Sequence, residues 1–431
     1  MLPARHLLAP AVLSALLLSG CLDPITSPFD AYEAKLRHPQ LLERAVRTDP
    51  AGKFGPWLGL LVRVRSRAHS HRWGIIERYR LVDRYELAPR QEFSEAFQGF
   101  SVEIRDTTGG ADFTAMLNAL RSDPDIEWLE PDFSLSTPRG TAESGRSGQR
   151  VPWSVALVGG RESSTVSGDG SGAVPVDVFV LDTGISNPDL DVVEALDFRP
   201  DHDDPGDRDG HGTHVAGIIG ALDDTEGLVG VAPGARVHNL KVLGDDGQTQ
   251  VSVVMEAVEY LLLRRLEHPA RPMVVNLSLG EHIGTTEFTA LDEAVERLVS
   301  LGAVVVVAAG NQSVDAAHVS PAHAPSVITV GAHDAQGRLA SFSNFGRSLD
   351  LLAPGVGVIS LAPSSDGAGA PVRMTGTSMA APHVTGAAAL YLSANPGSSP
   401  SAVLQALVGS ARQGPPGSGP TTNLTLWVGD F

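Results

Sequence analysis

The feature that most constrains the fold is a series of short, almost wholly apolar runs that alternate with helical patterns after residue 150. The runs are 176–181, 237–242, 273–277, 303–308 and 327–330, and the helical patterns are 211–222, 251–266, 286–301 and 378–393. Strands without polar alternation are buried on both faces, and strands separated by helices pair in parallel. The sequence therefore predicts an α/β fold over 151–431, with a doubly wound, mostly parallel sheet flanked by helices.

A smaller unit precedes this one. Strand patterns at 58–64, 97–104 and 126–132 surround a helical face, which predicts an α+β domain over 56–135. Residues 136–150 are nearly devoid of apolar side chains and predict a protease-accessible linker. Residues 21–55 contain several prolines and predict a tether with a short helix around 32–47.

The N-terminus is typical of an export signal. Arg5 and His6 precede an apolar run over 7–18 that is too short to span a bilayer permanently. Leu18-Ser19-Gly20-Cys21 is similar to a bacterial lipobox, in which cleavage after residue 20 leaves a lipid-bearing Cys21 at the new N-terminus. The alternative is an ordinary secretory signal in which the only cysteine of the chain is incidental. Either way we expect export from a bacterial cytoplasm, to a membrane-anchored or extracellular location.

The net charge of −18 lies entirely beyond residue 150, where 13 Lys and Arg face 31 Asp and Glu. Such a surface repels nucleic acid and anionic membranes. We therefore expect no nucleic-acid partner, and membrane contact only through a lipid on Cys21. The acidic groups are either simply solvated or bind Ca²⁺ in part.

Three segments carry residues suited to nucleophilic catalysis. Asp182 ends a buried strand, His211 begins a helix, and Ser378 begins another. Such groups collect beyond the carboxyl ends of parallel strands. Serine needs an imidazole to accept its proton, and a carboxylate must orient that imidazole. Taken singly, each residue has another explanation: Asp182 could serve only to form a turn, and Ser378 could serve only to cap a helix. His211 and His214 could together bind a metal ion, although the Glu of an H-E-x-x-H site is missing.

These segments closely resemble the subtilisin-like (subtilase) serine peptidases over residues 151–407, including the order Asp…His…Ser. The resemblance implies a serine endopeptidase acting on protein or peptide substrates, with Asp182, His211 and Ser378 as the triad and no cofactor for the chemistry. It also implies an oxyanion hole formed by Asn311 and the Ser378 amide, and we expect a monomer. The two walls of the S1 pocket are implied to be Ser278-Leu279-Gly280 and Ala308-Ala309-Gly310. Neither wall is charged, which favours an apolar P1 side chain, whereas Glu281 replaces a glycine of many relatives.

The smaller unit resembles the propeptide of the same family, a ferredoxin-like domain that ends here in Ile126-Glu127-Trp128-Leu129-Glu130-Pro131-Asp132. The resemblance implies an inhibitor and folding aid, with a maturation cut near 147–151. The alternative is a stable domain that is never removed. A cut would separate the peptidase from a lipid on Cys21, so it would either be released or stay bound non-covalently.

The family resemblance also implies a structural Ca²⁺ held by two loops. The residues that match are Asp189, Asp224 and the carbonyls of Leu222, Glu226 and Leu228, an oxygen set that suits a hard cation. A second acidic loop contains Asp201, Asp203, Asp204 and Asp207.

Two rival functions remain. A scaffold protein with this fold would be expected to lack a triad residue, and none is missing. A lipase or esterase would need a G-x-S-x-G elbow and the order Ser…Asp…His, whereas Ser378 lies in Gly-Thr-Ser-Met-Ala.

Overall fold

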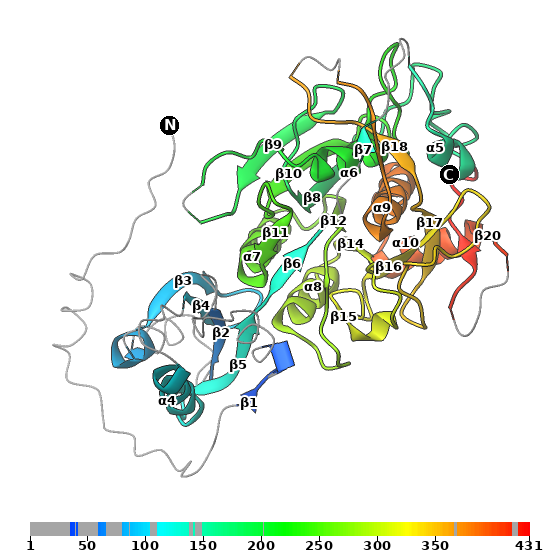
Figure 1. Cartoon of the computed structure of the whole chain (residues 1–431). Coiled ribbons are helices and arrows are strands. Elements are labelled where there is room, and N and C mark those ends of the chain that lie inside the picture. The colour runs from blue at the N-terminus through cyan, green and yellow to red at the C-terminus, as the bar shows by residue number, and fades with distance from the viewer. Residues whose placement is uncertain are drawn as a thin grey trace.

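The structure is a computed structural model of the whole chain (Figure 1). It describes residues 35–38, 40–41, 59–65, 80–85, 87–103, 110–137, 141–142, 149–200, 202–365, 369–415 and 421–431. The predicted signal peptide, Cys21 and most of the predicted tether and linker lie outside these ranges.

The larger unit is built on one sheet that contains nine strands among the described residues. In order across the sheet they are β20 (Arg412–Gln413), β21 (Leu424–Thr425), β17 (Leu351–Pro354), β16 (Ile328–His333), β14 (Val304–Ala308), β12 (Met273–Leu277), β8 (Asp177–Asp182), β10 (Arg236–Lys241) and β9 (Val192–Asp197). Neighbouring strands are parallel throughout, except for the β20–β21 pair at one edge. The predicted doubly wound, mostly parallel α/β fold is confirmed.

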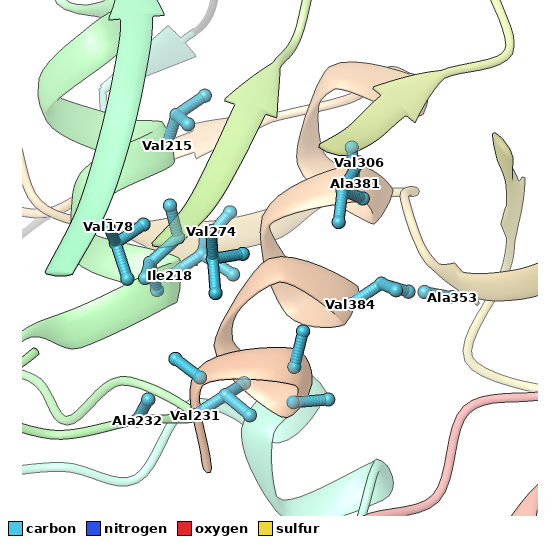
Figure 2. Close-up of a cluster of buried hydrophobic side chains, with 14 of the residues drawn as sticks. Val178, Val215, Ile218, Val231, Ala232, Val274, Val306, Ala353, Ala381 and Val384 are labelled. Carbon is cyan, nitrogen blue, oxygen red and sulfur yellow. The ribbon is translucent and has the colours of Figure 1, made fainter. Parts of the chain in front are cut away.

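The apolar strands are buried on both faces because successive side chains enter different cores. Val178 and Val180 of β8 belong to one cluster of buried side chains, and Phe179 and Leu181 belong to the other. Helices α6 (His211–Gly220), α9 (Thr377–Ala394) and α10 (Pro400–Ser410) pack on the first face, whereas α7 (Val251–Glu267) and α8 (Ala290–Ser300) pack on the second. Figure 2 shows the first core, with side chains of α6 and α9 among the strand valines.

The smaller unit has a sheet in the order β1-β5-β2-β4-β3. The strands are β1 (Lys35–Leu36), β2 (Gly59–Val64), β3 (Ala88–Phe93), β4 (Gly99–Glu103) and β5 (Ile126–Asp132), and α4 (Gly110–Arg121) precedes β5. Strands β5, β2, β4 and β3 pair antiparallel. This is the ferredoxin-like arrangement that the sequence predicts. β1 is an addition, because it pairs in parallel with the outer edge of β5. The sequence predicted a helix around 32–47. Among the residues described there, Lys35–Leu36 form a strand and residues 40–41 are helical.

Short strand pairs complete the structure, and two of them join residues 134–142 to the larger unit. β6 (Ser134–Ser136) lies antiparallel to β11 (Gln248–Gln250). β7 (Thr141–Ala142) lies antiparallel to β19 (Val372–Met374), which also pairs with β18 (Val358–Ser360). β13 (Glu281–His282) pairs with β15 (Val319–Ser320). Two short helical segments, α5 (Trp153–Leu157) and η1 (Ala316–His318), also belong to the larger unit, and residues 80–85 of the smaller unit are helical. None of the described helices is both long and apolar enough to traverse a bilayer.

Candidate active site

Asp182 and His211 meet where β8 ends and α6 begins. Nδ1 of His211 lies 2.7 Å from Oδ1 of Asp182, and both side chains are almost fully buried. Gly210 adopts a positive φ of 101° immediately before α6, a backbone conformation that favours glycine. Asp207 fixes the same turn, because its carboxylate accepts hydrogen bonds from the Thr183 hydroxyl at 2.9 Å and the Gly210 amide at 2.8 Å. The imidazole therefore has one preset orientation.

The pKa of His211 is set by opposing effects. Burial disfavours the imidazolium, but the charge of Asp182 and its hydrogen bond outweigh burial and raise the pKa of His211 above its ordinary value. Nε2 of His211 is buried and has no hydrogen-bond partner among the described residues. The arrangement therefore presents one nitrogen that is free to accept a proton.

Ser378 lies in the first turn of α9, and α9 packs against α6. Its hydroxyl donates to the Ser278 carbonyl at 3.0 Å, and the Ser278 hydroxyl donates to the Ser378 carbonyl at 2.9 Å. In this conformation Ser378 is thus hydrogen-bonded to the end of β12 and not to His211. The hydroxyl must give up this hydrogen bond before it can pass its proton to the imidazole.

The Asn311 side chain is oriented by Thr377, the residue before Ser378. Oδ1 of Asn311 accepts hydrogen bonds from the Thr377 amide at 2.8 Å and the Thr377 hydroxyl at 3.0 Å. Because the amide oxygen is occupied in this way, Nδ2 of Asn311 is the group left to donate. That donor lies beside the N-terminus of α9, where free backbone amides favour negative charge.

Asn344 is a functional candidate that the sequence analysis missed. Its Oδ1 accepts hydrogen bonds from the Gln312 and Val314 amides at 3.0 and 3.1 Å, and its Nδ2 donates to the Ala309 carbonyl at 2.8 Å. Asn344 thereby holds the turn that carries Asn311. No local signal reveals this, since the contact joins segments that are separated in sequence.

The two predicted pocket walls lie at the same edge of the sheet. Ser278-Leu279-Gly280 follows β12, and Ala308-Ala309-Gly310 ends β14, the strand paired with β12. Gly310 has a φ of 99°, which lets its amide donate to the Thr377 hydroxyl at 3.0 Å. Leu279 and Ala309 are both packed in apolar clusters. The walls are therefore brought together, but these two side chains serve packing.

Two of the five predicted calcium ligands come together through their side chains. Burial, with a contribution from the nearby charge of Asp224, raises the pKa of Asp189 to about 7. The Leu228 amide donates to Asp189 at 3.3 Å, and the Glu226 amide donates to Asp224 at 2.8 Å. The Leu222 carbonyl accepts a hydrogen bond from the Gln149 side chain at 3.0 Å. Gln149 was missed, because nothing in its local sequence points to a loop that lies far along the chain.

Other predicted metal features do not converge. In the second acidic loop, the Asp207 carboxylate accepts hydrogen bonds within the turn before α6, and Asp204 forms an ion pair with Arg208 at 2.6 Å. Asp201 lies outside the described residues. Nε2 of His214 lies 3.0 Å from the Val372 carbonyl, and burial lowers the pKa of His214 to about 3, so this ring is neutral. Over the described ranges, no three His, Cys, Asp or Glu side chains form a metal-binding group.

Comparisons with known proteins agree on one family. Residues 175–424 match the Subtilase family. The chain is 39% identical over 282 residues to an alkaline protease of Alkalihalobacillus alcalophilus, covering 65% of this chain and 67% of that protein. Subtilisin DY of Bacillus licheniformis is 40% identical over 268 residues, 61% of this chain and 92% of the relative.

A longer match and a solved structure support the same assignment. An extracellular serine proteinase of a Thermus species is 36% identical over 320 residues, 73% of this chain and 71% of the relative. The crystal structure of a cold adapted subtilisin-like serine proteinase matches with a TM-score of 0.55 at 32% identity, covering 64% of this chain and 97% of that one. The chain therefore belongs to the subtilase family of serine peptidases.

Proposed function

We propose that this serine endopeptidase acts on protein or peptide substrates through Ser378 as the nucleophile, His211 as the general base and Asp182 as the group that orients the imidazole. The observation that carries the proposal is the buried pair of His211 and Asp182 at 2.7 Å, which leaves the opposite ring nitrogen unoccupied. An imidazole held in this tautomer can accept the Ser378 proton as the hydroxyl attacks a peptide carbonyl.

The remaining steps follow from the donors around Ser378. The negative oxygen that forms on the carbonyl would be bound by Nδ2 of Asn311 and the Ser378 amide, because Oδ1 of Asn311 is already used by Thr377. His211 then gives its proton to the leaving amine, and water repeats the sequence on the acyl-enzyme. The substrate would lie between the walls after β12 and β14, whose uncharged residues favour an apolar P1 side chain.

We also propose that the chain is made as a zymogen whose smaller unit is an inhibitory propeptide. The contacts of β6 with β11 and of β7 with β19 support this, because β19 directly precedes the turn that carries Ser378. The strand pairings argue for a cut between Thr137 and Thr141. The sequence predicts a cut near 147–151, and a further cut just before Gln149 would leave intact the hydrogen bonds that the Gln149 and Arg150 amides donate to the carbonyls of Thr225 and Gly227.

Export with a lipid on Cys21 and a structural Ca²⁺ belong to the same proposal. Residues 1–20 would be removed as a signal peptide, and the mature peptidase would act as a monomer outside the cytoplasm. The raised pKa of Asp189 supports a cation beside it, since burial next to Asp224 leaves negative charge uncompensated there. Asp189, Asp224 and the carbonyls of Leu222, Glu226 and Leu228 would hold the ion, and it would stabilise the loop without entering the chemistry.

Intact-mass measurement and N-terminal sequencing of the full wild-type chain and of Ser378→Ala test the proposal. We expect the wild type to be cut between residues 137 and 141 and to digest casein, whereas Ser378→Ala stays whole. The expected loss of turnover is roughly 10⁶-fold, the value the corresponding serine has in a related subtilisin. Casein digestion at the wild-type rate by Ser378→Ala would overturn the assignment. If both proteins stay whole and inactive, the scaffold function is favoured.

A further inference from the structure

The chain segment that precedes the ferredoxin-like unit is attached to both units of the molecule. Lys35 and Leu36 form β1, whose register places them beside Trp128 and Leu129 of β5. The Arg37 amide then donates to the Leu129 carbonyl at 2.8 Å. Two paired residues make a short strand, so this pairing alone gives little stability. The residues that follow it turn toward the peptidase unit.

Arg37 is the centre of the contact with the peptidase unit. The residue is 7% exposed, and its Nη1 donates to Oε1 of Glu293 in α8 at 2.9 Å. The guanidinium also donates to the Phe288 carbonyl and lies 4.7 Å from the ring centroid of Trp128. One cation therefore joins a propeptide strand, the loop before α8 and α8 itself. A buried guanidinium with several fixed partners is a strong anchor.

The next residues extend this contact along the peptidase surface. Nε2 of His38, which is 1% exposed, lies 3.1 Å from the Phe288 carbonyl. The Gln40 side chain donates to the Ile283 carbonyl at 2.9 Å. Leu41 is 6% exposed and belongs to the apolar core that also contains Ile283 and the inner face of α8. The segment thus combines a buried charge, backbone-directed hydrogen bonds and an apolar anchor.

We propose that residues 35–38 and 40–41, here called the clamp segment, are a second attachment site that slows departure of the propeptide from the peptidase unit. The inference rests on the proposed zymogen function. A cut between Thr137 and Thr141 releases only the C-terminal end of the propeptide, and the clamp segment remains on the same fragment. Dissociation then requires Arg37 and Leu41 to leave their buried positions together, which lowers the off-rate.

The test follows the onset of activity in the cut complex of the full chain. Wild type, Arg37→Ala and Arg84→Ala are purified after self-cleavage and diluted, and hydrolysis of a chromogenic peptide is recorded until it becomes constant. Arg84 is a matched control because it pairs with Asp123 inside the ferredoxin-like unit. We expect Arg37→Ala to reach the wild-type plateau with an onset rate roughly tenfold higher or more, since the buried guanidinium and its hydrogen bonds to Phe288 and Glu293 are lost. We expect Arg84→Ala to remain within about twofold of wild type.

Two results would overturn the proposal that the clamp segment slows dissociation. One is an unchanged onset rate for Arg37→Ala, and the other is an equal rise for Arg84→Ala, which would indicate general loosening of the propeptide. A wild-type chain that is never cut would instead contradict the zymogen function. In that case hydrogen exchange on full-length Ser378→Ala still tests the clamp. If the clamp exists, the double variant Ser378→Ala/Arg37→Ala must show faster amide hydrogen exchange at the start of α8 than Ser378→Ala alone. The double variant Ser378→Ala/Arg84→Ala must not. Unchanged exchange at α8 would refute the clamp.

Discussion

At the scale of single residues, His211 shows how neighbouring charges set the working range of the enzyme. Burial disfavours its protonation, but Asp182 first, and then Asp209 and Asp207, raise its pKa above the ordinary value of 6.5. A general base must be neutral, so kcat/KM should fall as the pH drops through this raised pKa. Asp182 cannot be changed without losing the orientation of the ring, whereas Asp209 can.

Asp209→Asn should therefore shift the acid limb of the pH–kcat/KM profile to lower pH. The substitution removes one negative charge near His211 and retains an oxygen that can accept the His211 amide, now at 3.3 Å. Asp169→Asn is the control, because Asp169 is exposed and its carboxylate accepts the Ser171 amide and hydroxyl. If the two variants gave the same profile as wild type, the charge of Asp209 would have no role in setting this pKa.

The residue scale also shows what the sequence can and cannot reveal. Asp182, His211, Ser378 and Asn311 were predicted because each lies in a local motif, and the structure brings Asp182 to His211 and Asn311 to Thr377. Asn344 could not be predicted in the same way. Its role consists of hydrogen bonds between chain segments that are far apart, and such pairs leave no periodicity or spacing in the sequence.

At the scale of elements, the strands and helices that the sequence predicted lie close to the predicted bounds, whereas the buried strand β17, the helix α10 and the edges of the sheets were not predicted. β12 was predicted at its observed bounds, because a continuous apolar run marks a strand buried on both faces. β9 lies at the sheet edge, and its residues range from half-buried to exposed. β1 is two residues long and includes a charged side chain. Strands of this kind are specified by their partners and not by their own pattern.

The loop over 222–228 is predicted to bind calcium together with Asp189. With no cation, the pKa of Asp189 is raised to about 7, so ionisation of Asp189 should lower stability progressively as the pH rises from about 4 to 7. A bound cation would remove that penalty. We therefore expect EDTA to lower the Tm by a few degrees relative to excess Ca²⁺, and by more at pH 8 than at pH 5.

Asp189→Asn should lose this response, since it removes one of the two carboxylates. Asp169→Asn, which removes an exposed carboxylate elsewhere, should keep it. If the wild-type protein had the same Tm in Ca²⁺ and in EDTA at both pH values, a structural cation at this loop would be excluded.

At the scale of the whole molecule, the smaller unit, which we propose to be the propeptide, contacts the larger unit at the beginnings of two helices. Glu130 accepts hydrogen bonds from the Ala290 amide at 3.0 and 3.1 Å, at the start of α8. Asp132 accepts the Ser252 amide at 2.9 Å, at the start of α7. Free amides at a helix start favour such carboxylates. Both residues are nevertheless buried, and burial raises the pKa of Glu130 to about 8 and of Asp132 to about 6.

The direction of the pH effect on the complex follows from these values. A carboxyl group whose pKa is higher in the complex than in the free propeptide stabilises the complex fully below its free pKa, near 4.5 for Glu130. That stability is lost as the pH rises toward the bound value. Asp132 completes its change near pH 6, so the interval from pH 6 to 8 reports on Glu130, which faces Arg37, Asp292 and Glu293.

We therefore expect the cut complex to release active peptidase faster at pH 8 than at pH 6, when onset of activity is followed after dilution. Glu130→Gln keeps an acceptor for the Ala290 amide but cannot ionise, so its onset rate should change less over the same interval. The onset rate of wild type is divided by that of Glu130→Gln at each pH. Because both proteins contain the same triad, this ratio is independent of the effect of His211 on turnover. A ratio that stays constant from pH 6 to 8 would show that ionisation of Glu130 does not control release. A rising ratio of wild type to Glu130→Gln would mean that alkaline conditions both neutralise His211 and loosen the inhibitor, so one change of pH would activate the enzyme in two ways.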